Sequence, residues 1–189
     1  MTKGRMEAFS DGVIAIIITI MVLEMKVPHG SSLRDLKPIL PVFISYILSF
    51  TIVAIYWNNH HHMLHAAHKI NGTVLWANIH LLFWLSLFPF VAGWMGENNF
   101  ATVPAMFYGI VSMMAGIAYY FLAHCLTDIH GRDSEFANAL GSDTKGKLSV
   151  VIYAIAVALC FIHPLIALAL YFSVAVIWFI PDKRFENKD

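Results

Sequence analysis

Apolar stretches of membrane-spanning character dominate this chain and constrain its fold more than any other feature. A bilayer core about 30 Å thick takes roughly 20 helical residues, and that length separates the stretches from their connections. Their approximate bounds are 9–25, 38–60, 74–96, 103–124, 148–162 and 164–181. Because 59% of the residues are hydrophobic and 13% are charged, apolar side chains exceed what one soluble core can bury. We therefore expect an all-α integral membrane protein, a single domain over 1–189 with six transmembrane helices in the lipid bilayer.

The last two stretches are short, and only His163 and Pro164 separate them. Proline lacks a backbone donor and disfavours helix at the residue before it. A hairpin and a single kinked helix both fit this pattern. About 34 residues are too many for one span, so the sequence favours the hairpin.

The distribution of Lys and Arg predicts the orientation, because cytoplasmic loops carry the positive excess in multi-pass membrane proteins. With six spans, one side holds only Lys26, Arg34 and Lys37. The other side holds Lys3, Arg5, Lys69, Arg132, Lys145, Lys147, Lys183, Arg184 and Lys188. We therefore expect a multi-pass protein of the cell membrane with both termini in the cytoplasm.

Net charge and cysteine content exclude several classes of function. The formal net charge is +0, so no basic surplus is available to attract nucleic acid. Cys125 and Cys160 are too few for a disulfide framework. Both lie in or beside apolar runs, where thiols behave as small hydrophobic side chains.

The first apolar stretch begins with polar residues at the inner edge of the membrane, among them Arg5, Glu7, Ser10 and Asp11. Ionisable groups at such depth normally face protein or water and pair with one another, so they are functional candidates. A structural alternative is equally open at this point. Asp11 lies close enough to the interface to serve only as a neutralising partner of Arg5 near the helix start.

One stripe of the first helix is apolar from end to end. Helical spacing aligns Phe9, Gly12, Ile16, Thr19 or Ile20, and Leu23, with Glu24 at the outer end. A symmetric ring of such helices would stack these side chains into a narrow hydrophobic throat, which can gate by dewetting. On periodicity alone, the favoured alternative is that the stripe faces lipid.

Several motifs in the first half resemble those of one known family. The first helix carries Arg5-x-x-x-Phe9-Ser10-Asp11, and the second stretch carries Trp57-x-x-His60-His61. The third stretch contains Asn78 and the pair Pro89-Phe90. This set resembles the signature of the lysosomal potassium channel family known as transmembrane protein 175, in its bacterial branch. The resemblance extends to chain length and span number, whereas the second half matches only in hydropathy.

The resemblance implies a homotetrameric, potassium-favouring cation channel whose partners are potassium and other monovalent cations. It implies no cofactor, no metal, no catalytic residue and no enzyme activity. The first helix of each subunit would surround the axis, with the constriction at Ile16, Thr19, Ile20 and Leu23. A structural polar network near the cytoplasmic end would contain Arg5, Phe9, Ser10, Asp11, Trp57, His60 and Asn78.

Two further expectations concern single residues of this helix. Glu24 would form a weakly attractive carboxylate ring at the outer pore mouth, and an ordinary interfacial carboxylate is the equal alternative. Charge-assisted bonds from Arg5 would set the rotation of the first helix. The chain contains no Thr-Val-Gly-Tyr-Gly loop, which agrees with a constriction made by side chains.

A histidine-rich segment supports an alternative hypothesis for the function. His60, His61, His62, His65 and His68 lie within nine residues. His61, His65 and His68 share one helical face at metal-ligand spacing, as a membrane metalloenzyme or transition-metal transporter would require, and His80 or His124 could join them. No second histidine box supports this reading, and interfacial histidines at a helix end are the simpler interpretation. A secondary transporter is a third possibility, but no internal repeat is evident.

Overall fold

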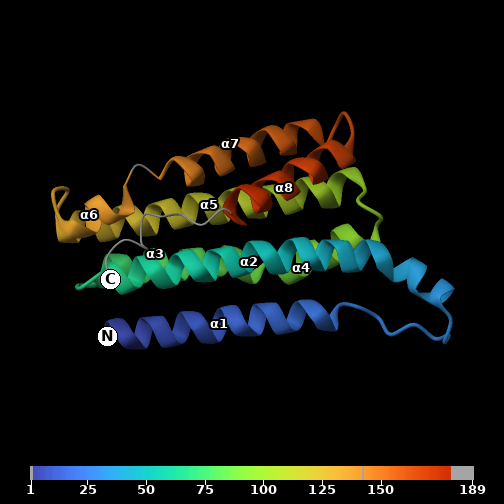
Figure 1. Ribbon diagram of the computed structural model, residues 1–189, viewed down its shortest axis with the longest axis horizontal. Coiled ribbons are helices and arrows are strands. Elements are labelled where there is room, and N and C mark those ends of the chain that lie inside the picture. Colours follow the sequence, from blue (N-terminus) through green and yellow to red (C-terminus); the bar gives the residue numbers. More distant parts are fainter. Residues whose placement is uncertain (1, 142, 180–189) are drawn as a thin grey trace.

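The computed structural model describes residues 2–141 and 143–179, and every regular element in this part of the chain is a helix. The long helices lie side by side and run up and down along one axis (Figure 1). The elements are α1 (Lys3–Leu23), η1 (Leu33–Ile39), α2 (Leu40–Ala66), α3 (Gly72–Ser86), α4 (Phe88–Glu97), α5 (Thr102–His130), α6 (Glu135–Leu140), α7 (Thr144–Leu159) and α8 (Pro164–Phe179). The expected all-α architecture is confirmed.

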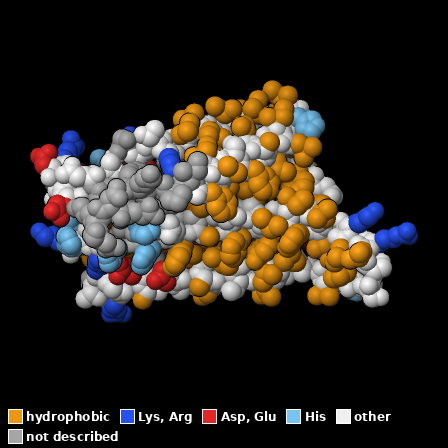
Figure 2. Space-filling view, in the orientation of Figure 1, with side chains coloured by type: hydrophobic (Ala, Val, Ile, Leu, Met, Phe, Trp, Pro, Cys, Tyr) orange, Lys and Arg blue, Asp and Glu red, His pale blue; other side chains and the backbone are white. Residues whose placement is uncertain are grey.

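Four helical segments of the described chain are long and apolar enough to cross a membrane: Lys3–Leu23, Leu33–Ala66, Gly72–Glu97 and Thr102–His130. α7 and α8 have 16 residues each and are shorter than a typical span. Figure 2 shows hydrophobic side chains gathered over the middle of the molecule and charged side chains at its two ends. This arrangement is the one that a bilayer requires of a protein embedded in it.

The third predicted stretch, 74–96, is two helices rather than one. α3 ends at Ser86 and α4 begins at Phe88, with Leu87 between them. Pro89 causes this break, because its ring clashes with the carbonyl four residues earlier and it has no backbone N–H to donate. The ladder resumes when the Val91 N–H donates to the Leu87 carbonyl at 3.1 Å.

α7 and α8 form the expected hairpin. The turn Cys160–His163 separates them, and the two helices pack against each other (Figure 1). Residues 180 and 181 of the last predicted stretch lie outside the described residues. The same is true of Lys183, Arg184 and Lys188, on which part of the predicted orientation rests.

Several helices extend beyond the apolar stretches that predicted them. α2 continues to Ala66 and α5 to His130, and the predicted connector 125–147 contains α6 and the start of α7. Hydropathy marks only the part of a helix that lies in lipid, whereas backbone hydrogen bonding continues into the polar region. The segments between spans are therefore shorter than the sequence predicted.

Close backbone contact between α2 and α4 depends on Gly96. A Cβ atom added there would lie 2.6 Å from the Val42 Cα atom and 3.2 Å from the Pro41 carbonyl oxygen. These are main-chain atoms, so a side chain at this position forces the two helices apart. Small residues allow such contacts between membrane helices.

We predict that Gly96→Ala destabilises the protein by about 1–3 kcal/mol, because a methyl group does not fit at this contact. Thermal unfolding of the purified protein in detergent measures the effect. Gly4→Ala is the matched control, since a Cβ there meets no atom within 4 Å. Equal melting temperatures for the two variants would contradict the close contact.

Candidate functional site

α1 has one buried face and one exposed face. Its buried residues are Met6, Ser10, Ile14, Ile17 and Met21, and they pack toward α2, α3 and α4. All but one of these five side chains are apolar, so the buried face is a hydrophobic seam with a single hydroxyl in it. Ser10 is fully buried and therefore needs hydrogen-bond partners within the protein.

The predicted stripe lies on the exposed face. Ile16 is 58% exposed, Ile20 41% and Leu23 79% in the single subunit, and Phe9 is also exposed. Thr19 lies among them, and its hydroxyl donates to the Ala15 and Ile16 carbonyls of the same helix. The stripe presents large apolar side chains that no other part of the described subunit covers.

A chain of buried hydrogen bonds joins α1 to α2 and α3. The His60 Nε2 atom lies 2.7 Å from the Asn78 Oδ1 atom, and the Asn78 Nδ2 atom donates to the Ser10 Oγ atom at 2.9 Å. The Ser10 hydroxyl then donates to the Met6 carbonyl at 2.8 Å. Because Oδ1 of Asn78 can only accept, His60 donates from Nε2, and each member of this chain has a partner.

A second hydrogen bond holds the outer side of α1. The Trp57 Nε1 atom donates to the Asp11 Oδ1 atom at 2.9 Å, and this bond lies in an exposed position. Trp57 comes from α2, as His60 does, so α2 bonds to α1 directly through Trp57 and indirectly through His60 and Asn78 of α3. Ser10 and Asp11, adjacent in the sequence, thus bond to different partners on the two sides of the contact.

Two members of the predicted network lie apart from these bonds. Arg5 and Phe9 are both exposed on the subunit. The Arg5 backbone N–H donates to the Thr2 carbonyl at 3.2 Å, but no hydrogen bond or ion pair of the Arg5 side chain occurs in the described ranges 2–141 and 143–179. The structure therefore brings together Ser10, Asn78 and His60, and separately Asp11 and Trp57, but not Arg5 or Phe9.

Lys3 holds α1 to the end of α2, a role that the sequence did not indicate. Its Nζ atom donates to the Ala67 carbonyl at 2.9 Å and to the His65 carbonyl at 3.3 Å, and it lies 3.8 Å from the Glu7 carboxylate. A cation near the last carbonyls of a helix is favourable. From the sequence, the charge of Lys3 indicates only the orientation of the first helix, since no neighbouring residue indicates a partner 64 residues away.

Charged residues surround the other end of α1. Glu24 is exposed there and packs beside Gly93 of α4. The Lys26 Nζ atom lies 2.6 Å from the Glu97 Oε1 atom. This hydrogen bond and the charge of Glu97 raise the pKa of Lys26. An open groove between α1 and α4 contains Ile16, Ile20 and Glu24 on one side and Phe90 and Trp94 on the other.

The histidine segment does not assemble a metal centre in the described part of the chain. Among those residues, no group of three or more His, Cys, Asp or Glu side chains is placed to hold a metal ion. His60 is committed to Asn78, and the ring of His61 stacks with those of Trp57 and His65. His80 and His124 have partners of their own in Trp84 and Asp128. The placement of these described histidines gives no support to the hypothesis of a metalloenzyme or metal transporter.

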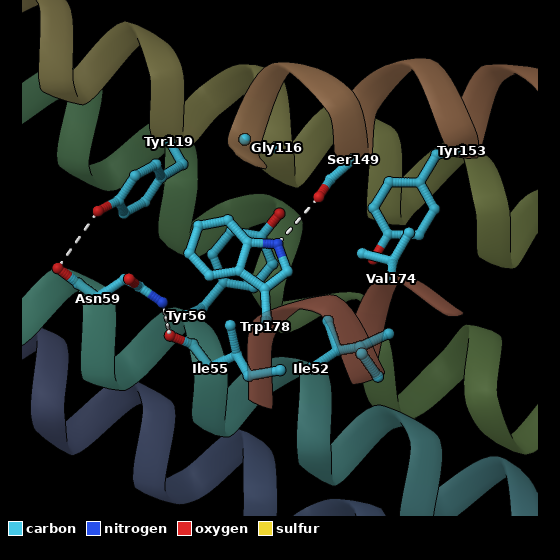
Figure 3. A pocket seen from close by; sticks show the side chains of 12 residues that line it. Ile52, Ile55, Tyr56, Asn59, Gly116, Tyr119, Ser149, Tyr153, Val174 and Trp178 are labelled. Carbon is cyan, nitrogen blue, oxygen red and sulfur yellow. Dashed lines mark hydrogen bonds between the residues drawn. The ribbon is translucent and has the colours of Figure 1, made fainter. Parts of the chain in front are cut away.

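A second pocket lies among α2, α5, α7 and α8 (Figure 3). Its walls combine aliphatic side chains with Tyr56, Tyr119 and Tyr153. The Trp178 Nε1 atom donates to the Ser149 Oγ atom at 2.9 Å across one wall. No charged side chain and no residue of α1 lines it, so it is distinct from the exposed stripe.

Comparison with known proteins places this arrangement in a family. Residues 5–89 match the model of the endosomal/lysosomal potassium channel TMEM175. A potassium channel of Chryseobacterium sp. (strain P1-3) is 53% identical over 187 residues, which cover 99% of this chain and 97% of that protein. The chain belongs to the TMEM175 family. The resemblance seen in the sequence motifs is thereby confirmed.

Two further channels are similar over much of the chain. A potassium channel of Streptomyces collinus (strain DSM 40733 / Tue 365) is 31% identical over 133 residues, covering 66% of this chain and 65% of that protein. The crystal structure of a lysosomal potassium-selective channel TMEM175 homolog from Chamaesiphon minutus matches with a TM-score of 0.78 and 27% identity. The match covers 94% of this chain and 96% of that chain. The second half of this chain, which includes α7 and α8, therefore shares the fold of that channel, although its sequence matches the family only in hydropathy.

Asn78 is the central member of the buried hydrogen-bond chain, because it bonds to both other helices. We predict that Asn78→Leu lowers the free energy of unfolding by about 1–3 kcal/mol, since Ser10 and His60 then each lose a buried partner. Thermal unfolding in detergent measures it. Asn98→Leu is the control, because the exposed Asn98 amide bonds only to the Trp94 carbonyl of the preceding turn. A loss of similar size in both variants would argue against this role of Asn78.

Proposed function

We propose that this protein conducts potassium across a membrane, with α1 as the pore-lining helix. Relatives that match nearly the whole chain include potassium channels, and the TMEM175 family is a family of channels rather than enzymes. The observation that carries the assignment of α1 is its exposed apolar stripe, on the face opposite a buried, hydrogen-bonded seam. A helix held so firmly from one side presents its other face in one defined rotation.

The stripe on α1 is exposed in a single subunit and is not enclosed by the described residues, so the proposal requires several copies. Four subunits around a common axis would bring four α1 stripes together, which covers the apolar side chains left exposed in one subunit. Closed rotational symmetry is the usual arrangement of such homo-oligomers. The groove between α1 and α4 offers Phe90 and Trp94 as a further apolar surface beside the stripe.

In that assembly Ile16, Thr19, Ile20 and Leu23 form the constriction. Aliphatic side chains offer no ligand to a hydrated cation, so the throat passes ions only where it is wide enough to stay wet. The hydroxyl of Thr19 donates within its own helix, which leaves its oxygen as the one polar atom facing this level. Such a throat acts as a hydrophobic gate.

Glu24 is the proposed cation-attracting residue at the pore mouth. Lys26, the nearest basic residue in the chain, is engaged by Glu97 at 2.6 Å. Glu24 acts on Lys26 more weakly than Glu97 does, and none of the ion pairs among the described residues includes Glu24. A ring of carboxylates raises the local concentration of cations.

The proposed topology has six transmembrane helices per subunit, both termini in the cytoplasm and a single channel domain over 1–189. At 1.5 Å per residue, α7 and α8 each extend about 24 Å, less than the typical hydrocarbon thickness of about 30 Å. Local thinning of the bilayer accommodates such a difference. After the hairpin, α8 runs back toward the end that holds the N-terminus (Figure 1).

We predict that Ile16→Asn or Leu23→Ser raises single-channel conductance and weakens the discrimination between potassium and sodium, because a polar ring hydrates the throat. Planar-bilayer recordings of the purified protein with bi-ionic reversal potentials measure both. Val151→Asn is the matched control, an equally exposed aliphatic position on α7. Wild-type conductance and selectivity in both α1 variants would refute this stripe as the pore surface.

Arg5 lies on the same exposed face as the stripe, one turn before Phe9, without a described partner in its own subunit. In a ring of subunits its charge would repel cations unless a carboxylate of the neighbouring copy compensates it. We predict that Arg5→Ala weakens the four-subunit complex and abolishes potassium flux into liposomes. Native mass spectrometry gives the subunit number, and Arg34→Ala, an exposed arginine on η1, serves as control. Wild-type assembly and flux in Arg5→Ala would remove this residue from the proposal.

A further inference from the structure

The segment between α2 and α3, residues 67–71, is held from both sides by side chains distant in sequence. From α1, Lys3 donates to the His65 and Ala67 carbonyls. From the end of α5, the His130 Nε2 atom lies 2.9 Å from the His68 backbone nitrogen and 3.2 Å from the Lys69 backbone nitrogen. Lys3 thus bonds to carbonyls at the end of α2 and the start of this connection, and His130 bonds to two amides within it.

These contacts determine the state of the His130 ring. Backbone N–H groups can only donate, so the Nε2 atom carries no proton and accepts both bonds. The Nδ1 atom lies 2.7 Å from the Leu126 carbonyl oxygen, which can only accept, so Nδ1 carries the proton. The ring also stacks on Phe136 of α6 at a centroid distance of 4.9 Å. His130 therefore holds the connection as a neutral imidazole in one tautomer and one orientation.

The connection joins the two helices that support α1. α2 carries His60 and Trp57, and α3 carries Asn78, all of which take part in the bonds that hold α1. Lys3 attaches α1 directly to the same connection. A displacement of residues 67–71 therefore acts on the supports of α1 from two directions.

We propose that His130 is a positioning residue for α1 that acts through residues 67–71, and that a proton on its Nε2 atom releases this connection. The protonated ring has N–H groups at both nitrogens and cannot accept from His68 and Lys69. The structural part stands on the hydrogen bonds alone. The consequence for conduction rests on the proposed function of α1.

Other charged groups occur around this site. The connection contributes His68, whose ring centroid lies 6.4 Å from that of His130, and Lys69, while α2 ends with His65. α6 contributes Glu135 next to the stacked Phe136, and the chain around His130 adds His124, Asp128, Arg132 and Asp133. None of the ion pairs among the described residues includes His130. Substituting His130 alone separates the effect of this ring from the effects of these neighbours.

Hydrogen exchange at the His68 and Lys69 amides tests the structural part, because His130 is the only described acceptor of these two N–H groups. We expect wild-type protection, corrected for the intrinsic effect of pH, to fall about tenfold between about pH 8 and about pH 5. His130→Gln keeps a neutral acceptor and should remain protected at both pH values, whereas His130→Ala should be unprotected at both. His124→Gln, a histidine six residues away on α5 that pairs with Asp128, should behave as wild type.

The proposal is overturned if wild-type protection is the same at both pH values, or if His130→Ala keeps it. The first of these outcomes needs no variant, so a folding defect in His130→Gln does not protect the proposal. Nitrogen chemical shifts of the wild-type His130 ring give a second test, since a proton on Nε2 at neutral pH contradicts the assigned tautomer.

Potassium flux into liposomes with the same pH on both sides tests the consequence for α1. We expect acid to lower the flux several-fold in wild type and in His124→Gln, but not in His130→Gln. Equal acid sensitivity in His130→Gln would refute the action on α1. If the wild-type protein carries no potassium at any pH, the proposed function fails, whereas the exchange result still decides whether His130 holds the connection.

Discussion

The buried hydrogen-bond chain from His60 through Asn78 to Ser10 is the interaction on which the arrangement of α1 depends. In an apolar seam, each of these groups would cost about 1–3 kcal/mol if it lost its partner. Only one rotation of α1 places Ser10 within 2.9 Å of Asn78. Hydrophobic packing of Met6, Ile14 and Ile17 alone would tolerate rotation, because aliphatic contacts have no direction. Polar bonds therefore supply the orientation, and apolar burial supplies the attachment.

That orientation decides which side chains of α1 remain uncovered. With Ser10 turned inward, Ile16, Ile20 and Leu23 face away from the subunit. Family membership supplies the second half of the argument, since the relatives that cover the whole chain are potassium channels. The residues of the proposed throat and those of the buried network thus lie on opposite faces of α1. A substitution in the buried network that rotates α1 would therefore change which side chains line the throat.

The supports of α1 are concentrated at the end of the molecule that holds the N-terminus (Figure 1). Ser10, Asp11 and Lys3 all bond there to α2, α3 or the connection between them. At the opposite end α1 is attached by the buried side chains of Ile17 and Met21, and the nearby Lys26–Glu97 ion pair is exposed and therefore weak in water. The long-range hydrogen bonds of α1 are therefore concentrated at one end, whereas apolar packing holds the other. The connection at residues 67–71 joins the two helices that carry these hydrogen bonds, so in our proposal a displacement of it changes the position of α1.

The sequence by itself determined the class of the protein, because helix-length apolar runs admit few environments other than lipid. It also determined the family, through Arg5, Phe9-Ser10-Asp11, Trp57, His60 and Asn78, and the hairpin at Pro164. Which of these residues bond to one another was decided only by the tertiary structure. Arg5 and Phe9 lie outside the bonded set, and Lys3 and His130 form bonds across more than 60 residues of chain. Periodicity is a local property, so it shows that a helix has a polar face but not which neighbour, distant in sequence, that face meets.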